Sequence, residues 1–200
     1  MHAVSVINAL LKPETVFRGI AGGSDEVSAP LHLITPFILL IPPVFVWLGS
    51  DLFGWRMGTN EPIFLDSTAR IIISFCYFSV LCVGYFSTVF IANWMGNTYG
   101  AHKPLSTYFN FFTVVYLPLL VASIAHLYPN AFFNLLVLLP TLIWCMTLLY
   151  KGLPIVLEIP PQQGMLMSSS LVGWLLVGAV SILGISVALW TIGLGPAIAV

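Results

Sequence analysis

Five long apolar stretches, separated by short segments that carry nearly all of the charges, constrain the fold of this chain most. They cover residues 31–48, 67–93, 108–127, 131–150 and 171–194. Each is close to the roughly 20 residues that a helix needs to cross a bilayer. Of the 200 residues, 59% are hydrophobic and only 6% are charged, whereas a soluble domain has roughly 25% charged residues. The sequence therefore predicts an all-α protein in which residues 24–200 form a membrane bundle of five transmembrane helices.

An amphipathic segment, residues 1–23, precedes the first stretch. Its apolar residues recur at helical spacing on both sides of Pro13: Val4, Ile7, Leu10, Leu11, Val16, Phe17 and Ile20. Pro13 suits the first turn of a helix, where its missing N–H costs nothing. Lys12, Glu14 and Arg18 make the segment too charged to span a membrane or to act as a cleaved signal peptide. We therefore expect it on the inner membrane surface or packed under the bundle.

Prolines interrupt three of the five stretches. Pro36, Pro42 and Pro43 lie in the first, Pro118 in the third and Pro140 in the fourth. A proline inside a helix removes a backbone hydrogen bond and crowds the preceding turn. The first helix is therefore expected to kink, or to end near Pro42. The turn at residues 127–130 is so short that the third and fourth helices must be antiparallel neighbours.

The positively charged residues set the expected orientation, because cytoplasmic loops carry an excess of Lys and Arg. With the N-terminus inside, the inner segments hold Lys12, Arg18, Lys103 and Lys151, and the outer side holds Arg56 and Arg70. Arg70 is expected to extend to the lipid headgroups. Residues 151–164 are expected to form a polar connection on the inner side. The sequence thus predicts a cytoplasmic N-terminus and a C-terminus on the outer side.

Several short motifs resemble, in kind and order, those of one membrane family. They are Tyr116-Leu117-Pro118, Leu127-Tyr128-Pro129, Leu149-Tyr150-Lys151-Gly152-Leu153-Pro154, the run from Pro13 to Ile20, and Ser168-Ser169-Ser170. Together they resemble the Yip (Ypt-interacting protein) domain family, and its bacterial, YohC-like inner-membrane branch most of all. The resemblance implies a helical inner-membrane domain with five spans and no known catalytic residues. Eukaryotic members act in vesicle traffic and bind Rab-type GTPases. This chain lacks their acidic Asp-Leu-Tyr-Gly-Pro type of segment, so the resemblance assigns no GTPase-binding residue.

The function expected from these features is non-catalytic, in membrane organisation or protein interaction. Ser181, Gly184 and Ala188 are spaced by three and four residues, which places small residues on one face of the last helix, as in helix–helix contacts. That face would pack within the bundle, against a second copy of the chain in a homo-oligomer, or against another membrane protein. Membrane lipids are the other expected partner. The net charge of −1 provides no basic surface for nucleic acid.

Binding or transport of a lipid or small molecule through the bundle is the alternative function. Backbone groups freed by the prolines can hold a substrate in the middle of the membrane. Polar residues of the third and fourth stretches are the candidates to line such a site: Asn110, Thr113, Tyr116, Asn134 and Tyr150. The competing interpretation is structural. In that interpretation, Tyr116 makes a hydrogen bond inside the bundle. Tyr150 is either its partner or a member of the aromatic belt at the membrane surface.

An enzyme is the third class considered, and the sequence argues against it. Cys145 and His126 are the nearest candidates for a nucleophile and a base, but nothing pairs them, and apolar surroundings make a thiol unreactive. His32, His102 and His126 fall on different segments. The expected topology places His126 near the outer side and the other two near the inner side. We therefore expect no metal site and no cofactor.

Overall fold

The computed structural model describes residues 12–23, 31–56, 58 and 61–193, with the side chains of residues 31–34 left aside. The described residues form six α-helices and one short 3₁₀ helix. These are α2 (Pro13–Ala21), α4 (Leu31–Leu52), α5 (Ser67–Thr98), α6 (Leu105–Ala122), η1 (Ser123–Leu127), α7 (Ala131–Leu157) and α8 (Pro161–Thr191). Five of the helical segments are long and apolar enough to cross a membrane. The predicted all-α bundle with five transmembrane helices is confirmed.

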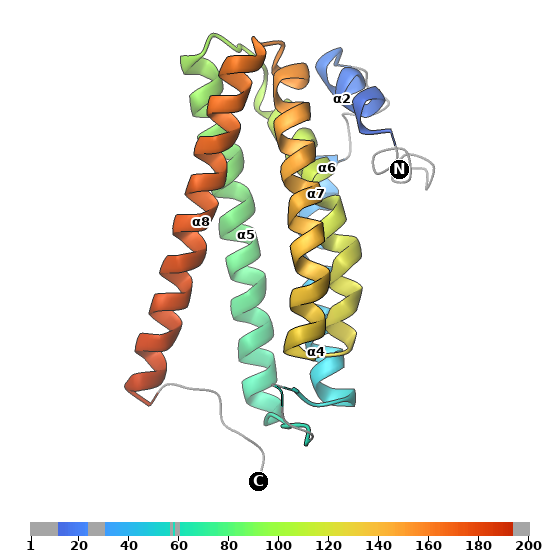
Figure 1. Cartoon of the computed structure of the whole chain (residues 1–200), viewed down its shortest axis with the longest axis vertical. Coiled ribbons are helices and arrows are strands. Elements are labelled where there is room, and N and C mark those ends of the chain that lie inside the picture. Colours follow the sequence, from blue (N-terminus) through green and yellow to red (C-terminus); the bar gives the residue numbers. More distant parts are fainter. Residues whose placement is uncertain (1–11, 24–30, 57, 59–60, 194–200) are drawn as a thin grey trace.

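Successive helices run in opposite directions along the bundle (Figure 1). One end of the bundle holds α2 and the α5–α6 and α7–α8 connections, and we call it the α2 end. The other holds the α4–α5 loop, the α6–α7 turn and the last residues of α8, and we call it the opposite end. The predicted antiparallel pair of third and fourth helices is present as α6 with η1 and α7.

Helix α2 is amphipathic and docks against the bundle. Phe17 is fully buried and Ile20 is only 3% exposed, while Glu14 and Arg18 are exposed. The Phe17 ring lies 5.5 Å from that of Phe111 in α6. Pro13 occupies the first turn, as predicted. Residues 1–11, which include the expected helical positions Val4 to Leu11, lie outside the described residues.

Helix α4 continues through all three of its prolines and ends at Leu52, so the predicted early end near Pro42 is wrong. Its second half stays helical because it packs on α5, α6 and η1, and neighbouring helices can compensate for lost backbone hydrogen bonds in a membrane protein. Gly49 permits this contact. A Cβ atom there would lie 2.7 Å from the carbonyl oxygen of Leu127.

The predicted polar connection at residues 151–164 is also wrong. Helix α7 runs on to Leu157 and α8 already begins at Pro161, which leaves three connecting residues. Leu153 and Val156 are fully buried at the α2 end. Their burial extends the helix beyond Lys151, which remains exposed. Pro161 stands in the first turn of α8, where a proline is tolerated.

The remaining boundaries differ by a few residues. Helix α5 extends to Thr98, and α6 begins at Leu105. The third stretch changes to a 3₁₀ helix at Ser123, a common way for an α-helix to end. Pro118 and Pro140 lie inside continuous helices.

Helix α6 is the centre of the bundle, and α8 is at its edge. Phe111, Phe112 and Leu117 of α6 are at most 5% exposed. Helix α8 contributes buried residues only at its beginning: Gly164, Met167, Ser168 and Leu171. No residue from 172 to 191, all of them described, is buried. In Figure 1, α8 and α5 diverge toward the opposite end.

Candidate functional site

The five residues predicted to line a ligand site fall into three separate places. Asn110 and Thr113 are 1% and 2% exposed inside the bundle. The Thr113 hydroxyl oxygen lies 3.0 Å from that of Thr35 in α4 and 2.9 Å from that of Tyr85 in α5. It also donates to the Phe109 carbonyl at 2.8 Å. Thr113 therefore joins three helices through hydrogen bonds within the protein.

Tyr116 and Asn134 are the two predicted residues that the structure brings to one cavity. The ring of Tyr116 packs edge-on against Tyr85, with 5.6 Å between centroids. Tyr150 lies toward the α2 end, where its hydroxyl is 2.9 Å from that of Ser169 in α8. Its hydrogen-bond partner is thus Ser169, which corrects the hypothesis of a bond between Tyr116 and Tyr150.

A polar cluster of His126, Tyr77 and Asn134 connects η1, α5 and α7 near the opposite end. His126 Nδ1 lies 2.7 Å from Asn134 Oδ1, and its Nε2 lies 3.2 Å from the Tyr77 hydroxyl. The Asn134 Nδ2 group donates to the carbonyls of Tyr128 and Asn130 at 3.0 and 2.9 Å. Asn134 Oδ1 must then accept from His126 Nδ1.

Two cavities meet at this cluster. The larger, about 250 Å³, lies toward the opposite end and is lined by Val46, Trp55, Ile73 and Ala131 in addition to the cluster. The smaller, about 150 Å³, extends into the bundle between Leu39, Leu81, Tyr116 and Val137. Both are lined by Tyr77, His126 and Asn134, so the cluster lies between the two cavities.

The wall at the opposite end is held by backbone hydrogen bonds between two loops. Trp55 and Ile63 exchange N–H···O bonds of 2.7 and 2.8 Å within the α4–α5 loop. The Arg56 N–H donates to the Pro129 carbonyl at 2.9 Å, and the Ala131 N–H donates to the Arg56 carbonyl at 3.1 Å. These bonds tie the α4–α5 loop to the α6–α7 turn, so the larger cavity has a preformed wall.

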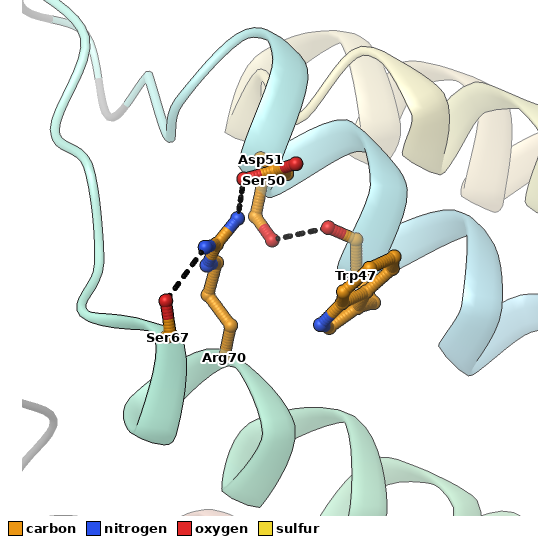
Figure 2. A network of polar contacts seen from close by, with 5 residues as sticks. All are labelled: Trp47, Ser50, Asp51, Ser67 and Arg70. Carbon is orange, nitrogen blue, oxygen red and sulfur yellow. Dashed lines mark hydrogen bonds and ion pairs between the residues drawn. The ribbon is translucent and has the colours of Figure 1, made fainter.

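An ion pair also links α4 and α5 at this end (Figure 2). Arg70 donates to the Asp51 carboxylate and, at 3.1 Å, to the Ser67 hydroxyl. The Arg70 side chain is only 14% exposed. Its partner is Asp51, and the position of Arg70 relative to the headgroups stays a prediction. Asp51 lies at the end of the preceding helix and holds the guanidinium against the bundle.

A second ion pair closes the α2 end. Lys103 Nζ lies 2.7 Å from Glu158 Oε2 and donates to the Ala21 carbonyl at 3.2 Å. Lys103 belongs to the α5–α6 connection, Glu158 follows α7, and Ala21 ends α2. One ammonium group thus joins three segments of this end.

The predicted packing residues Ser181, Gly184 and Ala188 are exposed on α8. A Cβ atom at Gly184 would meet no heavy atom within 4 Å. Their face is therefore exposed in the described part of this chain. A second copy, another membrane protein and lipid remain the possible neighbours.

The chemistry available at the cavity is hydrogen bonding by a phenol, an imidazole and an amide. His126 is engaged by Tyr77 and Asn134, and Cys145 is buried elsewhere, 8% exposed, in α7. Among the residues that the structure describes, no three His, Cys, Asp or Glu side chains gather closely enough to hold a metal ion.

Sequence analysis missed the roles of Tyr77 and Trp55 and the contacts of His126. Tyr77 and His126 are 49 residues apart in the sequence, and no spacing rule connects them. Tryptophan beside an apolar stretch is typical of an interface anchor, so nothing in the sequence marked Trp55 as a cavity residue. These positions become recognisable only when α5, η1 and α7 are placed side by side.

The fold and its two polar ends define an integral membrane protein of the polytopic α-helical class, with an amphipathic helix docked at one end. The family model of the Yip1 domain matches residues 7–183. The chain therefore belongs to the Yip1 domain family, and the resemblance found in its motifs is confirmed.

Two curated bacterial proteins are similar to this chain. The inner membrane protein YohC of Escherichia coli strain K12 is 26% identical over 165 residues, which cover 81% of this chain and 85% of that protein. The inner membrane protein YohC of Escherichia coli O6:H1 gives the same identity and coverage. No solved structure matches the chain significantly.

Proposed function

We propose that this protein is a non-catalytic component of the bacterial inner membrane that associates, through α8, with a second copy of itself or with another membrane protein. The location is supported by the five apolar helices and by the similarity to the inner membrane protein YohC. The association is supported by the face of Ser181, Gly184 and Ala188, which no other helix of the described chain covers.

The physical argument concerns what drives helices together in lipid. Apolar area alone provides no driving force there, because lipid tails are as apolar as leucine. Close backbone approach at small residues provides van der Waals contact instead. Helix α8 has bulky residues on its other faces, including Leu183 at 66% and Val187 at 53% exposure. The small-residue face is therefore the part of α8 that fits another helix best.

The test measures association of the full chain in liposomes by energy transfer between labelled copies. In Gly184→Leu a bulky side chain replaces the hydrogen, and we expect self-association, or copurification of the partner protein, to fall about tenfold or more. Ala179 is exposed and lies on the opposite side of α8, so Ala179→Leu is the matched control. Equal loss in both variants, or none in either, would refute the proposed role of this face.

We further propose that the α2 end faces the cytoplasm. Lys12, Arg18, Lys103 and Lys151 belong to that end, and Arg56 and Arg70 belong to the opposite one. The α2 end thus has more Lys and Arg residues than the opposite end, as is typical of the cytoplasmic side of membrane proteins.

Labelling with a membrane-impermeant thiol reagent tests this orientation. After replacement of Cys76, Cys82 and Cys145, a single cysteine is introduced at an exposed acid of either end, Glu14→Cys or Glu61→Cys. We expect the reagent to reach position 61 in intact spheroplasts and position 14 only after permeabilisation. The reverse pattern would invert the proposed topology.

A second candidate function is the binding of a lipid or small molecule. The observation that favours it is the pair of neighbouring cavities that share Tyr77, His126 and Asn134 as lining residues. This role is compatible with association through α8, because the cavities lie between α4, α5, α6, η1 and α7.

A further inference from the structure

We propose that Arg56 binds the phosphate of a membrane phospholipid and that one acyl chain of this lipid lies in an apolar groove beside Tyr128. This groove, which we call the Tyr128 groove, lies at the opposite end between the end of α4, α6, η1 and α7. Its lining includes Phe53, Val121, Ile124, Tyr128, Phe133 and Val137. Neither Tyr77, His126 nor Asn134 lines it, so the inference concerns a different place from the two cavities and does not depend on the role of α8.

The first observation is a cation that no acid of the described chain neutralises. Arg56 and Arg70 are the arginines of the opposite end, and Arg70 pairs with Asp51. Among the residues that the structure describes, none forms an ion pair or a hydrogen bond with the Arg56 side chain. Its guanidinium carbon lies 5.6 Å from the centroid of the Tyr128 ring. Because Arg56 is half-buried, its charge is partly removed from water and favours an anionic ligand.

The terminal nitrogens of Arg56 are the atoms that can reach a ligand. Its Nε is buried without a partner, so we assign no ligand contact to it. Nη1 and Nη2 are not among the buried nitrogens and donate to no described residue, so they are accessible. A guanidinium presents such donors as a planar fork that matches two oxygens of a phosphate. Arg56 can therefore bind a phosphate without breaking a hydrogen bond to the described part of the protein.

The backbone of Arg56 is fixed on both sides. Its N–H donates to the Pro129 carbonyl at 2.9 Å, and its carbonyl accepts from the Ala131 N–H at 3.1 Å. The second bond places Arg56 beside the beginning of α7, whose first turn contains no acid, so the helix dipole adds to the positive potential there. A cation held in place before the ligand arrives loses little conformational freedom on binding.

The second observation is an apolar groove at the same tyrosine. Tyr128 lines the groove, and its hydroxyl is the one polar side-chain group of the lining. The Tyr128 ring packs edge-on against Phe53 and Phe133, with centroid distances of 6.0 and 6.1 Å. Since the Arg56 guanidinium lies 5.6 Å from this ring, a phosphate bound to Arg56 places the acyl chains of the same lipid within reach of the groove.

The depth of the groove agrees with a phospholipid. Phe53 directly follows α4, and Tyr128 directly follows η1, so this part of the groove lies where the helices end, at the level of the headgroups. Val137 comes six residues after Ala131, the first residue of α7, and a helix rises about 9 Å over that length. The groove therefore runs from the headgroup level toward the hydrocarbon, as an acyl chain does.

The size and the opening of the groove agree as well. Its volume is about 560 Å³, within the roughly 300–1,000 Å³ of small-molecule sites. Val121 and Ile124 of its lining are 51% and 55% exposed, so a chain can enter from the side of the bundle. The groove holds the first part of one chain, and the rest of the lipid remains in the bilayer.

Each half of the site alone would favour a different ligand. A soluble phosphate ester would use Arg56 and leave the groove empty. A neutral lipid would use the groove and leave the Arg56 charge without a counter-ion. A phospholipid satisfies both halves, because it joins one phosphate to apolar chains.

The test is native mass spectrometry of the full chain in mild detergent, titrated with two defined lipids. Dioleoylphosphatidylglycerol carries the phosphate, and dioleoylglycerol has the same chains and esters without it. Glycerol phosphate, which has the phosphate and no chains, is added as a competitor. We expect the phospholipid to bind at a stoichiometry of one and about tenfold more tightly than dioleoylglycerol, as charge-assisted hydrogen bonds at a partly exposed site provide. Glycerol phosphate should not displace it.

Two variants locate the site, each with a matched control. Arg56→Gln removes the charge, so the preference for the phospholipid should fall to about twofold or less, whereas Arg56→Lys should keep part of it. Arg18→Gln, at an exposed arginine of α2, should retain the full preference. Val121→Trp fills the groove and should weaken binding of the phospholipid about tenfold. Val83→Trp, at a 68% exposed residue of α5, should bind as the parent does. Circular dichroism and thermal melting show that each variant is folded.

Four outcomes would overturn the inference. Equal binding of the two lipids by the parent protein would exclude Arg56 as a phosphate ligand. A loss of preference in Arg18→Gln as large as in Arg56→Gln would indicate general attraction to positive charge. Unchanged phospholipid binding by Val121→Trp would contradict the place of the acyl chain. Displacement by glycerol phosphate would identify a soluble phosphate ester as the ligand.

The same variants separate this inference from the proposed association through α8. Arg56 and Val121 lie outside α8, so energy transfer between labelled copies of Arg56→Gln or Val121→Trp should equal that of the parent. Failure of the lipid site would then leave the association unaffected, and loss of association in Gly184→Leu would leave the lipid preference unchanged.

Discussion

Gly152 of α7 faces Phe17 of α2 so closely that a Cβ atom on the glycine would lie 2.7 Å from the Phe17 ring. The same atom would lie 2.6 Å from Phe111 of α6. At Gly152 the backbone of α7 contacts α2 directly. Docking of the amphipathic helix therefore requires the absence of a side chain at Gly152 as well as the rings of Phe17 and Phe111.

We predict that Gly152→Ala destabilises the protein by about 1–3 kcal/mol, because the methyl group overpacks a full contact. Denaturant titration in detergent micelles measures the loss, and limited proteolysis within α2 should become faster. Gly173 of α8 has open space around its Cβ position. Gly173→Ala should be neutral or slightly stabilising, since alanine is favoured over glycine in helices. Similar losses at both glycines would contradict the close contact with Phe17.

The Thr113 hydroxyl is predicted to stabilise the bundle by about 1–2 kcal/mol, because it contacts Tyr85 and Thr35 inside a membrane protein. Thr113→Val keeps the shape and removes these hydrogen bonds, and the unfolding free energy should fall by that amount. The matched control is Thr147→Val, an exposed residue whose hydroxyl donates to the Ile143 carbonyl of its own helix. It should change stability by less than about 0.5 kcal/mol. An effect of Thr113→Val as small as the control would show that the three-helix junction contributes nothing.

Glu158 is the one non-glycine residue with a positive φ among those the structure describes, at 55°. It caps α7 in the left-handed conformation and pairs with Lys103. Glu158→Gly and Glu158→Ala both remove the carboxylate, but glycine adopts this conformation without strain. We therefore expect the glycine variant to be more stable than the alanine variant by about 1 kcal/mol.

The order of stability of the alanine and glycine variants should reverse at Val83, an exposed position inside α5. There Val83→Ala should exceed Val83→Gly in stability by about 1 kcal/mol, because glycine is a poor helix former. Unfolding titrations of the four variants provide both differences. An alanine variant at position 158 that matches the glycine variant would mean that the backbone relaxes there.

The pair of Arg70 and Asp51 should show a modest coupling energy. Asp51 is 48% exposed, so solvent weakens the attraction, and we expect about 0.5–1 kcal/mol from a double-mutant cycle with Arg70→Ala and Asp51→Ala. The coupling should decrease as salt is added. Glu14 lies at the α2 end, and Glu14→Ala should be additive with Arg70→Ala. Coupling of Arg70 to Glu14 as strong as to Asp51 would indicate a long-range charge effect instead of the local pair.

The sequence patterns predicted those features of the fold that depend on the composition and length of each segment. Apolar stretches near the thickness of a bilayer can do little other than span it as helices, since lipid leaves backbone groups no other partners. The amphipathic spacing around Phe17 and Ile20 likewise predicted a helix with one buried face. Family membership was predicted from the order of several short motifs, which can be recognised although the chain is only 26% identical to YohC.

Helix ends and side-chain partners were decided by the tertiary structure. Helix α4 was expected to kink or to end near Pro42, and Lys151 was expected to begin a connection. Packing of α4 on η1 and of Leu153 and Val156 under α2 outweighs these local signals, because burial against neighbours contributes more than the propensity of single residues. The pairing of Arg70 with Asp51 was not predicted, because the two residues lie 19 positions apart on different helices.

The sequence by itself determined that this protein is a five-span helical membrane bundle of the Yip1 domain family, because hydrophobic length and motif order are local properties of the chain. Only the tertiary structure decided which polar residues meet. It separated Tyr150 from Tyr116, buried Thr113 at a three-helix junction, and assembled Trp55, Tyr77 and His126 around one cavity. Such contacts join residues from different helices, and their distances depend on how those helices pack, which no spacing along one helix encodes.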